Sequence, residues 1–355
     1  MARVLVTGGA GFIGSRLCAR LAADGWDVVA ADVLHPQVHP DRVLPPEFPD
    51  GCEFVPFDVA IADPWEPLLR RAQPDCIVHL AAETGTGQSL SEASRHASVN
   101  VLGTTRMLDA AYRLSERPRH FVLTSSRAVY GDGAWASADG TVSYPGTRTP
   151  ASLRAGQWDH VAPDGGALTA LASIAGTTQT HPTNVYAATK LAQEHILESW
   201  CAATETALSI LRLQNVYGPG QSITNSYTGV LTFFARAAIA HDVIDVYEDG
   251  EIIRDFVFVG DVVDALAAAV SSPPATKRLL DIGSGAATTI AAAAKLMADA
   301  AGAPAPKVSG RFREGDVRAA SCSIDAARAD LGYAPATDLA TGVGQLLSWV
   351  AEAEQ

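Results

Sequence analysis

The sequence contains few cysteines, and their spacing suits neither a disulfide framework nor a metal site. The five cysteines in 355 residues are odd in number and never occur as Cys-x-x-Cys. They are Cys18, Cys52, Cys76, Cys201 and Cys322. This usage is typical of a reducing compartment, so we expect a cytoplasmic protein with no structural zinc and no other metal centre.

Positive charge is also scarce. The chain has 26 lysines and arginines against 39 acidic residues, a formal net charge of −13, and it contains no basic run. This balance argues against binding to nucleic acid or to an anionic membrane. The alanine-rich stretches 265–270 and 291–301 are too short to span a bilayer, and Met1 leads into a candidate strand without the pattern of a signal peptide. We therefore expect no nucleic-acid partner and no membrane association.

A glycine-rich turn near the start of the chain is the first positive signal. An apolar run at 4–6 precedes Gly8, Gly11 and Gly14, and an amphipathic segment follows. Glycines at these positions permit a sharp turn, close approach of the backbone to a diphosphate, and close packing of helix on strand. The N–H groups at the helix start then point at the phosphates. The pattern predicts a dinucleotide-binding strand–turn–helix unit, with a plain turn as the alternative.

Asp32 indicates which dinucleotide would bind. It ends the next predicted strand, 27–32, and lies eighteen residues after Gly14. An acidic side chain at this place binds the adenosine ribose hydroxyls. Residues 33–37 contain no lysine or arginine that could neutralise a 2′-phosphate. The sequence therefore predicts NAD rather than NADP.

The remaining apolar runs predict the organisation of the chain. Strands at 53–59, 75–80, 120–125 and 208–213 alternate with helical segments, and after 213 the pattern changes to short strands and helices. We predict an α/β fold, a Rossmann-type doubly wound parallel sheet with a smaller mixed α/β C-terminal substrate-binding lobe. The NAD-binding domain would span 1–213, with an irregular insertion at about 132–183 that folds against the site or caps it. Residues 214–355 would form mainly the substrate lobe, with some segments returning to the sheet.

Three side chains carry the predicted chemistry. Tyr186 and Lys190 lie four residues apart on a predicted helix, 184–203, so they share one helix face. A neighbouring ammonium group stabilises phenolate and lowers the pKa of a tyrosine, which lets Tyr186 act as a general base. Ser126, at the end of a strand, would orient the same substrate hydroxyl. Asp58, at another strand end, would bind the adenine amino group or cap the following helix.

Together these features resemble the extended short-chain dehydrogenase/reductase superfamily, specifically its nucleotide-sugar epimerases and dehydratases. The resemblance covers essentially the whole chain and includes the motifs at 79–82, 215–219, 254–257 and 315–316. It implies that Tyr186 is the base, that Lys190 holds the cofactor ribose, and that Ser126 assists. The implied cofactor-binding residues are Gly8, Gly11, Phe12, Ile13, Gly14, Asp32, Asp58, Val59, Leu80, Ala81, Ala82, Asn100, Tyr186 and Lys190. The implied substrate-binding residues are Thr84, Ser126, Arg127, Asn215, Arg254, Arg313 and Asp316, of which Asn215, Arg254 and Arg313 would hold the sugar diphosphate.

The residues after Ser126 narrow the reaction that the resemblance implies. Dehydratases of this group place Asp-Glu where this chain has Arg127 and Ala128, decarboxylating relatives place Glu at the second position, and 3,5-epimerases place Cys there. Ala128 can replace none of them, which leaves an NAD-dependent 4-epimerase that oxidises C4 to a ketone and reduces it from the opposite face. A nucleotide-sugar ketoreductase or dehydrogenase and a non-catalytic NAD-binding regulatory protein are the alternatives.

A closer similarity concerns the substrate. The segments 82–89, 124–131, 221–222 and 227–229 are similar to those of bacterial enzymes that act on dTDP-L-rhamnose, which also carry an insertion around a tryptophan such as Trp158. Several of those relatives have a Cys-x-x-Cys where this chain has 162–166, which contains no cysteine. The resemblance implies a dTDP-6-deoxyhexose such as dTDP-L-rhamnose, or a UDP-hexose, as substrate. It also implies a homodimer formed through 92–114 and 184–203.

Overall fold

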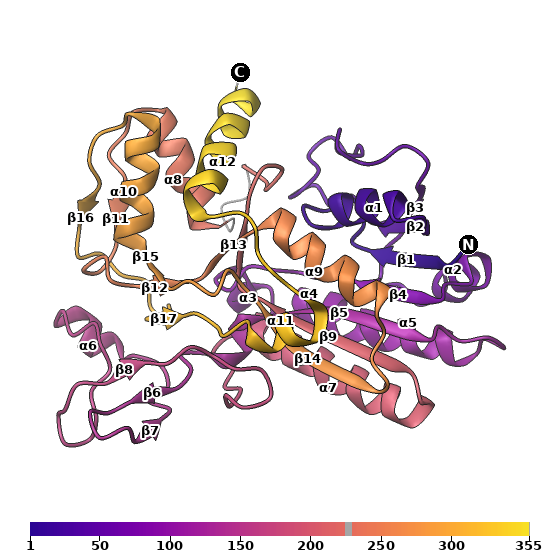
Figure 1. Ribbon diagram of the computed structural model, residues 1–355, viewed down its shortest axis with the longest axis horizontal. Helices are drawn as coiled ribbons and strands as arrows, with labels where there is room; N and C mark the ends of the chain where they lie inside the picture. Colours follow the sequence, from indigo (N-terminus) through magenta and orange to yellow (C-terminus); the bar gives the residue numbers. More distant parts are fainter. Residues whose placement is uncertain (224–228, 355) are drawn as a thin grey trace.

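A seven-stranded parallel sheet organises the protein (Figure 1). The computed structural model describes residues 1–223 and 229–354; Tyr227 and Thr228, which contribute to the resemblance above, lie outside the described residues. In spatial order the strands are β14 (Lys277–Ile282), β9 (Ala207–Leu213), β5 (His120–Ser126), β4 (Cys76–His79), β1 (Arg3–Thr7), β2 (Asp27–Asp32) and β3 (Glu53–Pro56). Every neighbouring pair is parallel, so all seven carboxyl ends meet at one edge. The predicted Rossmann-type sheet is confirmed.

Helices cover both faces of this sheet, because apolar side chains that alternate along each strand point to both faces and must be buried there. Val4 and Val6 face one layer, whereas Leu5 between them faces the other. The first layer contains α1 (Gly14–Ala23), α9 (Val259–Ser271) and α11 (Asp325–Leu331). The second contains α2 (Trp65–Ala72), α5 (Gly103–Tyr112) and α7 (Val185–Thr204).

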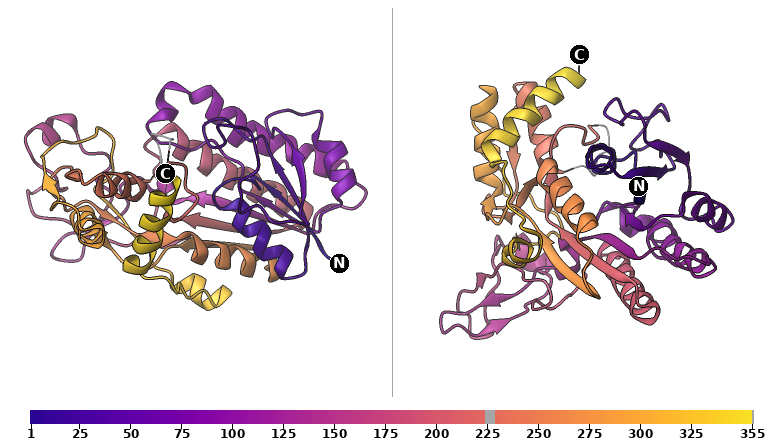
Figure 2. Two further views of the ribbon diagram at one scale, coloured as in Figure 1. Left: turned by 90° about the horizontal axis from the view of Figure 1, so that it is seen from above. Right: turned by 45° about the vertical axis from the view of Figure 1, so that its right-hand side comes forward.

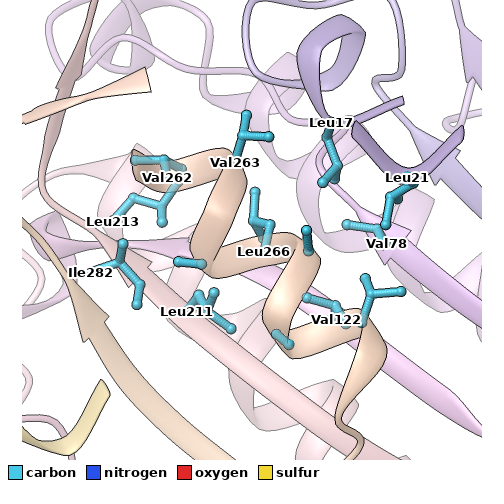
Figure 3. Packing of buried hydrophobic residues seen from close by; sticks show 14 of the residues in the cluster. Leu17, Leu21, Val78, Val122, Leu211, Leu213, Val262, Val263, Leu266 and Ile282 are labelled. Atoms are coloured by element: carbon cyan, nitrogen blue, oxygen red, sulfur yellow. The ribbon is translucent and has the colours of Figure 1, made fainter. Parts of the chain in front are cut away.

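One strand of the large sheet and one helix that covers it come from the C-terminal part of the chain. Strand β14 pairs with β9 at the sheet edge, and helix α9 lies across the strands. Figure 3 shows Val262, Val263 and Leu266 of α9 packed between Leu17 of α1 and the strand residue Leu211. Segments beyond residue 213 thus complete the core that supports the cofactor-binding edge.

A second group of elements packs beside the sheet. Its helices α8 (Val230–Ile239), α10 (Ile290–Ala301) and α12 (Leu339–Ala353) share one apolar core with short strands. These strands pair as β10 (Asn215–Tyr217) with β13 (Phe256–Phe258), β11 (Asp245–Val246) with β16 (Lys307–Val308), and β15 (Thr288–Thr289) and β17 (Ala319–Ala320) with β12 (Ile253–Arg254) between them. This mixed α/β lobe stands apart from the β1–β3 edge in both views of Figure 2.

The segment 132–183 is less irregular than its composition suggested. It contains a three-stranded antiparallel sheet, in which β6 (Trp135–Ala136) lies between β7 (Val142–Ser143) and β8 (Thr169–Ala170), and the short helix α6 (Pro150–Arg154). Ser173 pairs with Cys322, and Figure 1 shows the segment beside β12 and β17 rather than on the large sheet. The insertion therefore docks on the second lobe.

Two boundaries differ from the predictions. The strand predicted at 53–59 ends at Pro56, because the chain turns at 57–60 before α2. The helix predicted from about residue 92 is a succession of α3 (Gln88–Ser91), α4 (Ala93–His96), a π-helical segment Ala97–Leu102, and α5. A π-helical turn re-aims the side chains that it carries, and such turns are frequent near functional sites.

Among the described residues, no helix has the length and apolar character needed to cross a bilayer. The five cysteines are free thiols. The described ranges also contain no group of three or more His, Cys, Asp or Glu side chains arranged to hold a metal ion.

Candidate active site

The glycine turn sits between β1 and α1 and is closed by contacts that only glycine tolerates. Gly8 has φ +71°, and a Cβ there would lie 2.8 Å from the Ala81 backbone nitrogen. A Cβ on Gly14 would lie 2.1 Å from the Gly8 carbonyl oxygen. At Gly11 a Cβ would meet only that same oxygen among the described residues, at 3.3 Å, so these residues leave the other side of Gly11 open. Steric need inside the protein explains Gly8 and Gly14, and the open space at Gly11 fits the close approach of a dinucleotide diphosphate.

Asp32 lies beside this turn at the end of β2. Its carboxylate accepts hydrogen bonds from the backbone N–H groups of Ala10 (3.1 Å) and Leu34 (2.9 Å). These two bonds fix the carboxylate at the glycine turn and leave lone pairs for two ribose hydroxyls. Asp58 accepts from the Ala60 N–H at 2.8 Å, which closes a turn. The alternative that Asp58 caps the following helix is wrong, because Pro64 occupies the N-cap position of α2.

The end of β4 brings small residues against the glycine turn. Ala81 donates its N–H to the Thr7 hydroxyl at 3.3 Å, and Leu80 donates its N–H to the Thr7 carbonyl at 3.1 Å.

The other predicted site residues near this edge differ in exposure. Thr84 is exposed in the loop that follows β4. Phe12 and Ile13, in the glycine turn, are half-buried, whereas Val59 is buried where it packs against Gly103.

Asn100, in the π-helical segment, is held by contacts between two parts of the site. The side chain is fully buried; its oxygen accepts from the Glu83 N–H at 2.8 Å, and its amide group donates to the Glu83 carbonyl (3.0 Å) and to the Thr189 hydroxyl (2.9 Å). Asn100 thus ties the loop after β4 to helix α7. Its contacts are those of a residue that orients the walls of the site.

Tyr186, Ser126 and Arg127 come together at the same sheet edge. Ser126 is the last residue of β5, and its hydroxyl oxygen accepts from the Ala128 N–H at 3.2 Å, which leaves the hydroxyl proton free to be donated. Asn184 caps α7 by accepting from the Ala187 N–H at 2.9 Å, so the helix begins at Val185, one residue before Tyr186. Burial raises the pKa of Tyr186, and the Ser126 hydrogen bond and the charge of Arg127 oppose that rise.

In the chain by itself, the groups that favour the Tyr186 phenolate against burial are Ser126 and Arg127. The effect of Lys190 on Tyr186 stays a prediction. Lys190 lies one helical turn further on and is only 2% exposed. Its ammonium group has no hydrogen bond or ion pair within the described part of the chain, and burial lowers its pKa to about 8. A buried, unpaired ammonium at this place suits the ribose hydroxyls of a cofactor.

A buried polar cluster supports Lys190 and the turn after β5. Glu194, one turn beyond Lys190 on α7, favours the charged form of Lys190. Glu194 is held by Arg212 at 2.6 Å and 3.0 Å, and the Arg212 guanidinium lies 4.8 Å from the ring centroid of Tyr130. The Tyr130 hydroxyl donates to both oxygens of Asp281, at 2.9 Å and 3.0 Å.

Asp281 makes stability depend on pH. Burial raises the pKa of Asp281 to about 7, and its bond from Tyr130 and the charge of Arg212 oppose that rise. A carboxyl with a raised folded-state pKa stabilises the fold fully below its unfolded pKa of about 4, and this contribution is lost as pH rises toward 7. We expect Asp281→Asn to remove this dependence, so that the variant loses less unfolding free energy between pH 4 and 7, by up to about 1.4 kcal/mol per pH unit. Urea unfolding at several pH values measures both slopes; equal slopes would exclude Asp281 as the cause.

Arg254 lies on the second lobe, close to the catalytic groups. Its guanidinium donates to Asp316 at 2.7 Å and to the Ile253 carbonyl at 2.7 Å, and the residue is 6% exposed. This ion pair leaves further N–H groups of Arg254 available for a phosphate. The exposed Arg313 lies over the Tyr247 ring, 5.4 Å from its centroid. The Asn215 side-chain oxygen is buried and has no partner among the described residues.

Arg127 makes no hydrogen bond or ion pair to any described residue, although it lies close to Tyr186, Arg254 and Asp316. Burial and the charge of Arg254 lower its pKa to about 10, and the carboxylates of Asp316 and Asp132 oppose that shift. A half-buried guanidinium without an acceptor at the edge of the site is suited to a polar ligand.

Gln214 is a candidate that our sequence reasoning missed. Both polar atoms of its buried amide lack a hydrogen-bond partner among the described residues. It lines the same small cavity as Arg127. The available signal was its place at the exit of β9, directly before Asn215.

Arg127 also gives a testable prediction about pH. Because its charge favours the Tyr186 phenolate, Arg127→Met should raise the pKa of Tyr186. The acidic limb of the kcat profile, which reports loss of the base by protonation, should then move to higher pH. The profile should be measured at saturating substrate, so that weaker binding does not contribute. An unmoved limb would show that Arg127 does not influence the base.

Comparisons with known proteins agree with this geometry. The model of the NAD dependent epimerase/dehydratase family matches residues 4–151 and 159–283. The dTDP-L-rhamnose 4-epimerase of Burkholderia thailandensis is 53% identical, over 99% of this chain and 95% of the relative. The UDP-glucose 4-epimerase of Mycolicibacterium smegmatis is 31% identical, over 98% of each chain. The structure of Thermus thermophilus UDP-glucose 4-epimerase in complex with NAD matches with a TM-score of 0.75 at 26% identity, over 99% of each chain.

Family, cofactor and activity class follow from this agreement. The glycine turn, Asp32 and Lys190 fit NAD, and the structure of the Thermus thermophilus relative is a complex with that cofactor. The protein is an NAD-dependent nucleotide-sugar 4-epimerase. The chain belongs to the NAD-dependent epimerase/dehydratase family.

Proposed function

We propose that the protein interconverts the C4 epimers of a dTDP-linked 6-deoxyhexose, with dTDP-L-rhamnose as the first candidate. The observation that carries the proposal is the meeting of Tyr186, Ser126 and Arg127 at the NAD-binding edge, with Ala128 where an acid would be needed to expel water. The relative that is 53% identical supports the choice of nucleotide and sugar, since its name gives that substrate.

The chain's own groups move the proton. Tyr186 takes the proton of the C4 hydroxyl and later returns it, while the Ser126 hydroxyl donates a hydrogen bond to the same substrate oxygen and keeps its own proton. Bound NAD would supply the acceptor, and later the donor, of the C4 hydride. Lys190 holds the nicotinamide ribose, Asp32 the adenosine ribose, and the Gly8–Gly14 turn the cofactor diphosphate.

Epimerisation also requires the sugar to turn while the substrate stays bound. Arg254, with Arg313 and Asn215, anchors the substrate diphosphate, because guanidinium groups suit a dianion. The anchored end keeps the ketone intermediate in the site as the ring rotates. Arg127 and Gln214, which line one small cavity, hydrogen-bond the sugar hydroxyls.

Assembly and location are part of the same proposal. We infer a cytoplasmic location from the reduced cysteines, and a division near residue 213 into an NAD-binding domain and a substrate lobe.

We also infer a homodimer through the helical segments 92–114 and 184–203, where Leu102 and Tyr112 are exposed apolar side chains. Light scattering of the wild type and of Leu102→Glu tests the dimer, which should dissociate in the variant.

The reaction is tested by incubating the purified protein with dTDP-L-rhamnose, and separately with UDP-glucose, without added cofactor. NMR follows the sugar while absorbance reports reduced nicotinamide. We expect conversion of dTDP-L-rhamnose to its C4 epimer with no net NADH. Conversion that requires added NAD(P)(H) in stoichiometric amounts would instead indicate a dehydrogenase or reductase, and conversion of UDP-glucose alone would change the substrate class.

A further inference from the structure

The insertion reaches the second lobe through a buried arginine. Arg148 is 5% exposed, and its guanidinium donates to both carboxylate oxygens of Glu248, at 2.7 Å and 2.9 Å. The same group donates to the Trp158 carbonyl at 3.0 Å, within the insertion, and to the Asp316 carbonyl at 2.9 Å, outside it. One side chain therefore joins two parts of the insertion to Glu248 and Asp316.

Asp316 connects this arginine to the candidate diphosphate site. While its carbonyl accepts from Arg148, its carboxylate accepts from Arg254 at 2.7 Å. Asp316 is thus held from one side by Arg148 and holds Arg254 on the other. A movement of the Asp316 backbone would move the carboxylate that orients the Arg254 guanidinium.

The next residues of this segment are fixed by the insertion as well. The Arg318 N–H donates to Asp132 at 2.7 Å, and the Arg318 guanidinium donates to Asp159 at 2.7 Å. Arg318 also pairs with Asp249 at 2.7 Å and 2.8 Å. The insertion therefore contacts both ends of 316–318, and rigid support of this kind is what a precisely placed binding group requires.

From these contacts we propose that Arg148 is a positioning residue of the substrate site, which fixes Asp316 and through it the Arg254 guanidinium that binds the diphosphate. This inference rests on the proposed function, because it takes Arg254 as the diphosphate ligand. It gives the insertion at 132–183 a role in binding although the insertion need not touch the substrate. Burial of ion pairs is by itself a weak source of stability, whereas a guanidinium that makes four directed bonds fixes geometry well.

The test is a double-mutant cycle on the holoenzyme, with dTDP as the probe and calorimetry as the measurement. We expect Arg254→Met to weaken dTDP binding about 10- to 100-fold, as loss of a hydrogen bond between charged groups does. Arg148→Met should weaken it about 10-fold without loss of bound NAD. Because Arg148 acts through Arg254, the double variant should bind no more weakly than Arg254→Met alone. Multiplied losses in the double variant would overturn the proposal.

Two further variants separate positioning from folding. Arg148→Lys keeps a cation beside Glu248, but the lysine side chain cannot reach both Glu248 and the Asp316 carbonyl. This variant should therefore fold, and its affinity for dTDP should be lower than that of the wild type. This variant decides the question if Arg148→Met does not fold, and wild-type affinity in it would overturn the proposal. Arg70→Met breaks an exposed ion pair with Glu66 on α2 and should bind dTDP like the wild type. If the wild type itself binds no dTDP, the proposed function fails rather than the positioning role.

Discussion

Tyr186→Phe is expected to lower kcat on dTDP-L-rhamnose by about 10²- to 10⁴-fold, the range for loss of a general acid–base group. The substitution removes only the phenolic oxygen at the start of α7 and leaves the aromatic ring in place. Ser126 can still hydrogen-bond the substrate hydroxyl, but its neighbours Arg127 and Lys190 carry positive charge at neutral pH and do not accept the proton. NMR time courses at saturating substrate measure kcat directly.

The outcome is informative only if the variant still binds NAD and dTDP. Both affinities should stay within about threefold of the wild type, because a loss confined to kcat marks an interaction made in the reaction itself. Tyr144→Phe is the matched control: it removes a hydroxyl that accepts an exposed hydrogen bond from the Gln179 N–H in the insertion. Its activity should be unchanged. Wild-type turnover by Tyr186→Phe would refute the assignment of the base.

The parts of the site that sequence predicts best are those encoded locally. Gly8, Gly14 and Asp32 belong to one strand–turn–helix–strand unit, and their contacts run within or beside that unit. Tyr186 and Lys190 share a helix face by their spacing alone. The apolar alternation of the strands similarly indicates a sheet that is buried on both faces.

Electrostatics and side-chain partners were less predictable. The spacing of Tyr186 and Lys190 does not reveal that burial dominates the pKa of Tyr186, or that Arg127 opposes this effect. The motif position of Asn100 likewise gives no sign of the π-helical turn that carries it toward Glu83. Such outcomes depend on groups that meet only after the chain has folded.

Contacts across long separations were beyond prediction from one sequence. Arg148 and Asp316 are 168 residues apart, and no local pattern links them. The composition of 132–183 indicated an insertion near the site, but a β-sheet of two-residue strands leaves almost no periodic signal. This segment is instead held on the second lobe by buried ion pairs such as Arg148–Glu248.

Those buried pairs lead to the second large effect. Glu248 is 1% exposed and faces two arginines, Arg148 at 2.7 Å and 2.9 Å and Arg318 at 3.2 Å. We expect Glu248→Gln to lower the free energy of unfolding by about 3–5 kcal/mol, the usual cost of leaving a buried charge without its partner. Gln has nearly the same shape as Glu, so the loss reports the charge and one hydrogen-bond acceptor rather than packing. Urea unfolding at neutral pH measures it.

Substitutions at Glu248 also test whether its ion pair with Arg148 is needed for stability or for the position of Asp316. Replacement of both partners, in Arg148→Met with Glu248→Gln, removes the unpaired guanidinium and should recover part of the lost free energy. It should not recover dTDP affinity, because no donor then holds the Asp316 carbonyl. As a control, Glu66→Ala breaks exposed pairs on α2 and should change the unfolding free energy by less than about 1 kcal/mol. A Glu248→Gln effect as small as this control would mean that water reaches Arg148 and that the insertion is held mainly by its other contacts.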